Sequence, residues 1–87
     1  MQNIEKYIEE IKQMWLELLE LQEVGLDDNF FAMGGTSLSA MLLLNRIETA
    51  YDIEIEAEDL ADHQTIREVA IVVAEKRAPY DRLFGGE

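Results

Sequence analysis

The sequence has 87 residues, enough for one small domain with a modest core. Nineteen acidic and seven basic side chains give a net charge of −12, which repels phosphate-rich surfaces and so excludes nucleic acids and anionic membranes as partners. There is no cysteine and only one histidine, His63, which excludes disulfides, thiolate catalysis and a multi-histidine metal site. We see no signal peptide and no apolar run long enough to cross a membrane, so we expect a cytoplasmic protein.

The first predicted element is an amphipathic helix that begins after Asn3, its predicted N-cap, and stops at Gly25. Its buried face is predicted from apolar side chains that recur every three or four residues. These are Ile4, Tyr7, Ile8, Ile11, Met14, Trp15, Leu18 and Leu21. We expect Trp15 to lie in the core.

An irregular stretch follows over residues 22–36. A loop of about 15 residues is long for a compact domain, and such loops are usually functional or disordered. Apolar residues within it favour an ordered loop pinned across the bundle. They are Leu26, Phe30, Phe31 and Met33.

The second helix is predicted over residues 37–51. Its core face carries Ala40, Leu43, Leu44, Ile47 and Tyr51 at helical spacing. Residues 52–58 alternate acidic and apolar side chains, which is typical of a strand. Because no partner strand is predicted, we interpret this segment as an extended connector, followed by a short helical turn over 58–61.

The last helix begins at a capping box, in which Thr65 caps forward and Glu68 reaches back. Ala78-Pro79 is its predicted end, and residues 79–87 are expected to form a frayed tail. The elements together predict an all-α fold: a four-helix bundle of three main helices and one short one. We expect residues 1–87 to form a single domain and the protein to be a monomer.

Ser37 is the candidate functional residue. Gly34 and Gly35 allow a tight turn directly before it, and the N-terminal end of a helix favours a phosphate through its free N–H groups and dipole. The alternative is that Ser37 only caps the helix of an unmodified interaction module. A serine hydrolase would need His63 as its base and has no G-x-S-x-G pattern, and a nucleotide-binding loop would need the missing Walker lysine.

The segment around Ser37 resembles the core motif of peptidyl carrier proteins, the thiolation domains of nonribosomal peptide synthesis. That pattern is roughly D-x-F-F-x-x-G-G-(D/H)-S-(L/I), and the matching residues run without a gap from Asp28 to Leu38. Residues 60–66 also resemble the family segment L-F-x-H-P-T-I. The sequence departs from the family at three positions, where Thr36, Ala61 and Gln64 replace the usual Asp or His, aromatic residue and proline.

The resemblance implies that Ser37 accepts 4′-phosphopantetheine from coenzyme A, delivered by a separate phosphopantetheinyl transferase. The thiol of the arm would then hold an aminoacyl or acyl group as a thioester, so the chain would be a carrier and not an enzyme. Its further partners would be an adenylating loading enzyme and downstream condensation, tailoring or thioesterase enzymes. A polyketide or fatty-acid acyl carrier, or a D-alanyl carrier, is a related alternative. We expect a free-standing protein.

Apolar side chains beside Ser37 predict a docking surface. Leu38, Met41 and Leu42 are expected to contact partners, together with Thr36. Arg46 and Arg67 are expected to pair with neighbouring carboxylates. For His63 we expect local packing or a loop hydrogen bond.

Overall fold

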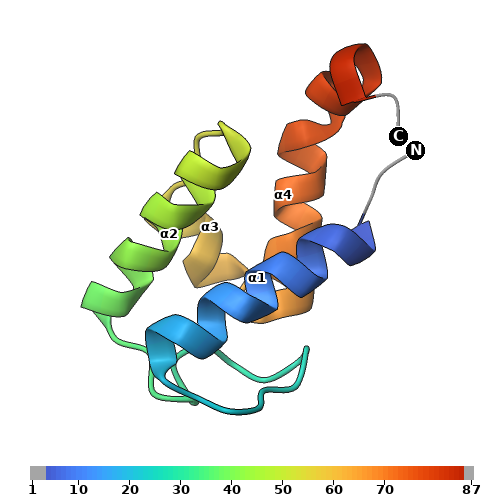
Figure 1. Cartoon of the computed structure of the whole chain (residues 1–87). Helices are drawn as coiled ribbons and strands as arrows, with labels where there is room; N and C mark the ends of the chain where they lie inside the picture. The colour runs from blue at the N-terminus through green and yellow to red at the C-terminus, as the bar shows by residue number, and fades with distance from the viewer. Residues whose placement is uncertain (1–3, 86–87) are drawn as a thin grey trace.

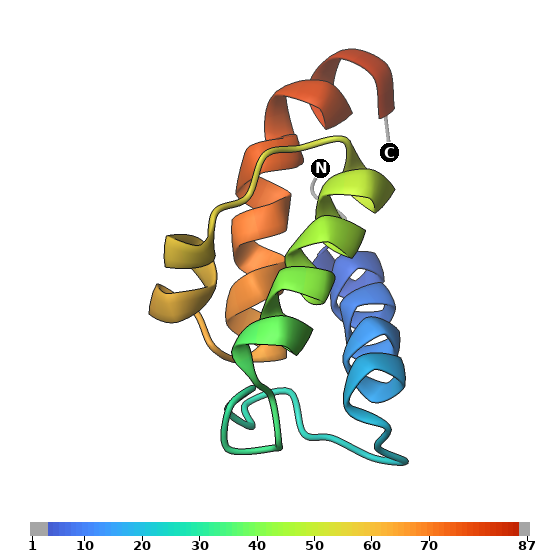
Figure 2. The same cartoon turned by 90° about the vertical axis from the view of Figure 1, so that its left-hand side faces the viewer.

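The computed structural model describes residues 4–85 and confirms the all-α prediction of a small four-helix bundle (Figures 1 and 2). Three helices are long and α3 is short, and a π-helical turn, η1, follows α4. The elements are α1 (Ile4–Leu19), α2 (Ser37–Tyr51), α3 (Ala57–Asp62), α4 (Ile66–Tyr80) and η1 (Asp81–Gly85). The turn η1 lies far from the start of α2 in both views, and the start of α1 lies far from it in Figure 1.

The core lies where α1 packs against α4 and α2. Trp15 is fully buried there, as predicted. The other large side chains that are fully buried are Ile11, Phe30, Leu43, Ile47, Ile66, Val69 and Val73. Of the predicted core face of α2, only Ala40 remains partly exposed. The predicted connector over 52–58 is shorter in the structure: Asp52 is a left-handed residue that ends α2, residues 53–56 form the connector and bury Ile55, and α3 begins at Ala57.

The predicted end of the first helix at Gly25 is wrong, because α1 stops at Leu19. Glu20 adopts a left-handed conformation with φ of 56°, and the Leu21 N–H then donates to the Leu16 carbonyl oxygen at 2.9 Å. A left-handed residue with such a bond commonly closes a helix. Leu21 still packs against the core after the turn, so the apolar spacing in the sequence continues beyond the end of the helix. The predicted N-cap, Asn3, lies outside the described residues.

The predicted helix end at Ala78-Pro79 is also wrong. Helix α4 includes Pro79, continues to Tyr80 and leads into η1. Asp81 holds this end in place. Its carboxylate accepts a hydrogen bond from the Tyr7 hydroxyl at 2.7 Å and forms an ion pair with the Arg77 guanidinium, with 3.5 Å between Oδ1 and Nη2. Residues 81–85 form η1, and residues 86–87 lie outside the described part of the chain, so the fraying expected of the tail over 79–87 stays a prediction.

The two buried tyrosines of the core predict a loss of stability at alkaline pH. Burial, and then the hydrogen bond to Asp81, raise the pKa of Tyr7 above its ordinary 10.0. Burial, and then the hydrogen bond to Glu10, also raise the pKa of Tyr51 above its ordinary value. The folded state thus keeps these protons longer than the unfolded state does. The contribution is complete below pH 10 and is lost as the pH rises above it, by up to about 1.4 kcal/mol per pH unit for each tyrosine.

Urea unfolding followed by circular dichroism between pH 8 and pH 11.5 checks this expectation. The variants Tyr7→Phe and Tyr51→Phe should each have a shallower alkaline decline than the wild type. Equal slopes in all three proteins would contradict it.

Candidate functional site

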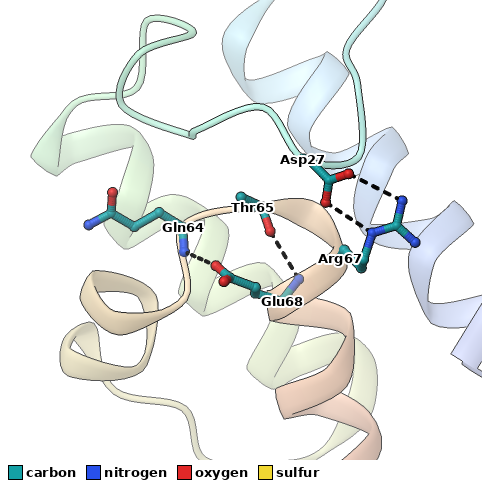
Figure 3. Close-up of polar contacts among 5 residues, drawn as sticks. All are labelled: Asp27, Gln64, Thr65, Arg67 and Glu68. Atoms are coloured by element: carbon teal, nitrogen blue, oxygen red, sulfur yellow. Dashed lines mark hydrogen bonds and ion pairs between the residues drawn. The ribbon is translucent and has the colours of Figure 1, made fainter.

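The loop before α2 is ordered by backbone hydrogen bonds to the start of α4. The Phe30 N–H donates to the Gln64 carbonyl oxygen at 2.7 Å, and the Arg67 N–H donates to the Leu26 carbonyl oxygen at 3.1 Å. Arg67 also pairs with Asp27 at 2.9 Å (Figure 3), and this bond raises the pKa of the guanidinium. The predicted ordered loop is confirmed.

Two adjacent aromatic residues of this loop have different roles. Phe30 is fully buried and packs edge-on against Trp15, with ring centroids 5.0 Å apart. Phe31 was predicted as an anchor but is 41% exposed. Its ring packs edge-on against that of Phe30, with ring centroids 5.2 Å apart. An Asn29 turn fixes this arrangement, because its Oδ1 accepts the Phe31 N–H at 2.9 Å.

Gly35 is required by close packing against Phe30. Its N–H donates to the Phe30 carbonyl oxygen at 3.0 Å. A Cβ at this position would lie 2.4 Å from the Phe30 ring and 2.7 Å from that oxygen, far inside van der Waals contact. Trp15 backs the ring, so the ring cannot simply move away.

Gly35→Ala is therefore expected to destabilise the fold by about 1–3 kcal/mol, as overpacking of a filled site does. Urea unfolding measures this loss. Gly25→Ala is the matched control, because the atoms nearest to its Cβ would belong to the Asp28 side chain, at 3.1 Å, in an exposed turn. Equal losses in the two variants would contradict the packing argument.

Thr36, and not Ser37, is the N-cap of α2. Thr36 has extended backbone angles, and its Oγ1 accepts the Ser39 N–H at 3.2 Å. The Ser39 hydroxyl in turn accepts the Thr36 N–H at 2.7 Å, which completes a capping box. The alternative in which Ser37 serves as the cap is therefore wrong.

Ser37 is the first residue of α2 and is exposed. Within residues 4–85 its hydroxyl takes part in no hydrogen bond, and neither its N–H nor that of Leu38 donates one. The first N–H groups of a helix have no partner within the helix and carry the positive end of its dipole. The geometry thus combines a free hydroxyl with free donors suited to an anion.

The side chains that follow Ser37 on α2 include three exposed apolar ones. Leu38 is 68% exposed, Met41 67% and Leu42 48%. No charged residue occurs from Asn29 to Asn45, although 30% of the chain is charged. The role of these three side chains in docking stays a prediction, but the exposure on which it depends is present.

A groove of about 320 Å³ opens beside Ser37 and was not foreseen from the sequence. The loop, α2 and α3 all contribute residues to its lining, and we call the loop side and the α3 side its two walls (Figure 2 shows α2 and α3 side by side). Its lining, apart from Ser37, is apolar and comprises Phe31, Ala40, Met41, Leu44, Ala57, Leu60 and Ala61.

The remaining predicted residues lie away from the groove lining. Arg46 pairs with Glu17 of α1, so both predicted arginine–carboxylate pairs are confirmed. His63 ends α3 and is half-buried, and its imidazole makes no hydrogen bond to the described residues. Thr65 caps α4 through the Glu68 N–H as predicted, but the Glu68 carboxylate reaches back to the N–H of Gln64, not of Thr65 (Figure 3).

The fold and the site define a small helical domain that displays one free serine hydroxyl at the end of its bundle. Residues 9–73 match the family described as the phosphopantetheine attachment site, which is most of the chain. The chain therefore belongs to the phosphopantetheine attachment family, a family of carrier domains, and 4′-phosphopantetheine is the cofactor of that family.

Curated relatives include much longer proteins. The chain is 35% identical over 78 residues to a plipastatin synthase of Bacillus subtilis, and the match covers 88% of this chain and 3% of that protein. It is 38% identical over 72 residues to the phosphinothricin tripeptide synthetase PhsB of Streptomyces viridochromogenes, and this match covers 83% of this chain and 6% of that one. The chain thus spans only a small fraction of these relatives.

Solved structures with this fold include peptidyl and acyl carrier proteins. One is the phosphopantetheine transferase Sfp in complex with coenzyme A and a peptidyl carrier protein, with a TM-score of 0.77 and 29% identity over 79% of this chain and 90% of that chain. Another is BlmI of Streptomyces verticillus, a type-II acyl-carrier protein of bleomycin biosynthesis, with a TM-score of 0.77 and 28% identity over 80% of this chain and 84% of that one.

Two kinds of feature are absent from residues 4–85. No helix there is both long and apolar enough to span a membrane. No group of three or more histidine, aspartate and glutamate side chains is placed to hold a metal ion.

Proposed function

We propose that the chain carries 4′-phosphopantetheine on Ser37 and holds an aminoacyl or acyl group as a thioester on that arm, as a peptidyl carrier of nonribosomal peptide synthesis. The observation that carries this proposal is that different residues cap α2 and present the free hydroxyl. Thr36 and Ser39 satisfy the cap, so the exposed Ser37 hydroxyl has no structural task.

The residues present fit the group. A phosphodiester on the Ser37 oxygen would lie at the helix N-terminus, within reach of the free N–H groups of Ser37 and Leu38. The apolar groove beside it offers a surface for the carbon atoms of the arm. When bound, the group supplies a thiol, which a chain without cysteine lacks. The chain itself contributes only the hydroxyl and its placement, so we propose that it is not an enzyme.

The proposed partners are a phosphopantetheinyl transferase, an adenylating loading enzyme and downstream condensation, tailoring or thioesterase enzymes. Support comes from similar proteins. One solved relative is described with a transferase and coenzyme A, and another, 28% identical, as an adenylation and carrier pair with phenylalanyl-adenylate. The uncharged surface formed by Leu38, Met41 and Leu42 is suited to brief apolar contacts with such enzymes.

A type-II acyl carrier is the second candidate, and the similarity to BlmI favours it. Both candidates use the same serine and arm and differ in the cargo and the partners. A free-standing, monomeric and cytoplasmic protein with one domain over residues 1–87 stays a prediction.

The proposed function is tested by intact mass after incubation with coenzyme A and a promiscuous phosphopantetheinyl transferase. We expect a gain of one phosphopantetheinyl group, which fragmentation should locate on Ser37 and not on Thr36 or Ser39. A folded protein that gains no mass, or gains it on another residue, would refute the proposal.

A further inference from the structure

The Gln64 side chain is not part of the groove lining, but it joins the two segments that carry the groove walls. Its Nε2 donates to the Ala61 carbonyl oxygen at 2.7 Å. Its Oε1 accepts a hydrogen bond from the Asn29 side-chain amide at 2.6 Å. One carboxamide thus binds the end of α3 and the loop before α2 at the same time.

Asn29 and Ala61, the two partners of the carboxamide, belong to the two walls of the groove. Asn29 holds the turn that places Phe31, since its Oδ1 accepts the Phe31 N–H. Ala61 itself lines the α3 wall. Both Phe31 and Ala61 border the same groove as Ser37. The carboxamide therefore bridges the two walls that flank the serine.

Gln64 is itself held by its backbone. Its carbonyl oxygen accepts the Phe30 N–H at 2.7 Å, and its N–H donates to the Glu68 carboxylate at 3.1 Å. Figure 3 shows the carboxamide pointing away from Glu68, so the backbone and the side chain use separate partners. The side-chain hydrogen bonds to Asn29 and Ala61 therefore start from a residue whose backbone is held just before α4.

Helix α3 depends on such tertiary contacts. It has six residues, too few for a helix that is stable by itself. Its other contacts with the bundle include the buried Leu60 and a 3.8 Å ion pair between Asp59 and Lys76. A hydrogen bond at its last turn therefore has a large share in fixing its position.

We infer that Gln64 is a positioning residue, whose carboxamide sets the separation between the Phe31 turn and α3 and so shapes the surface that a modifying enzyme contacts around Ser37. The inference rests on the proposed function of Ser37. It does not place Gln64 in the chemistry, because no hydrogen bond among the described residues joins Gln64 to Ser37 or to its cap.

The first test is the steady-state transfer of phosphopantetheine from coenzyme A to the full chain. In Gln64→Ala the KM for the chain is expected to rise about threefold to tenfold, as for the loss of one or two hydrogen bonds, with kcat within about twofold of wild type. Gln64→Glu keeps the acceptor for Asn29 but loses the donor to Ala61, so a smaller rise is expected. Gln22→Ala is the matched control, because Gln22 is exposed and its side chain bonds to no described residue.

The second test needs no modification. Hydrogen exchange of the amides of residues 57–62 should be about threefold to tenfold faster in Gln64→Ala than in Gln22→Ala. The central amides of α1 and α4 should exchange at the same rate in both variants.

The outcomes separate the two proposals. If the wild type is not modified, the proposed function fails, and the exchange measurement alone decides whether Gln64 fixes α3. If the wild type is modified, an unchanged KM in Gln64→Ala overturns the inference. Faster exchange throughout α1 and α4 overturns it as well, because it would reveal a general loss of stability.

Discussion

Ser37→Ala is expected to abolish the gain of phosphopantetheine completely while the free energy of unfolding stays within about 0.5 kcal/mol of wild type. The hydroxyl is the only atom removed, it is exposed, and no described residue bonds to it. Intact mass and urea unfolding on the same preparation measure both effects.

The neighbouring residue should show the opposite behaviour. Thr36→Ala removes the side-chain acceptor of the capping box and is expected to cost about 0.5–2 kcal/mol, with the mass gain retained. Residual modification of Ser37→Ala, or a loss of stability as large as that of Thr36→Ala, would contradict the division of roles between the two residues.

Phe30→Ala is expected to destabilise the protein by about 3–5 kcal/mol, the usual cost of deleting a fully buried aromatic side chain. The whole free energy of unfolding of a chain this size is on the order of 4–13 kcal/mol. The ring lies between Trp15 and Phe31, so its removal opens a cavity and leaves the wall of the groove unsupported. Urea unfolding followed by circular dichroism measures the loss.

Phe31→Ala is the matched control, because Phe31 is 41% exposed and should cost less than half as much. Where Phe30→Ala does not fold, Phe30→Leu provides a milder change, with an expected loss of about 1–2 kcal/mol. Similar losses for Phe30→Ala and Phe31→Ala would contradict the different roles of the two rings.

The helices were predictable where local signals and core contacts agree. Helix α2 has the predicted bounds, and α3 is one residue longer at each end than expected. The ends of α1 and α4 were not predictable from local pattern. Leu21 packs on the core after the helix has ended, and Asp81 is fixed by Tyr7, which is 74 residues away in the sequence.

The candidate site was predictable only in part, for a similar reason. Ser37 followed from the glycine turn and the motif, but its rival role as a cap could be excluded only from the Thr36 backbone and the Ser39 hydroxyl. The groove joins residues from three segments, and no local pattern brings Phe31 next to Ala61. Gln64 stood out in the sequence only as a departure from a motif.

The start of α1 and the turn η1 lie at a distance from Ser37, the first residue of α2, and this affects how the protein can be attached to a support. The bundle is 37 Å along its longest axis; η1 lies away from the start of α2 in both views, and the start of α1 does so in Figure 1. An affinity tag, a resin or another domain joined at either of those segments would be held at a distance from the serine. The protein could therefore be immobilised through such a tether and still offer Ser37 to enzymes in solution.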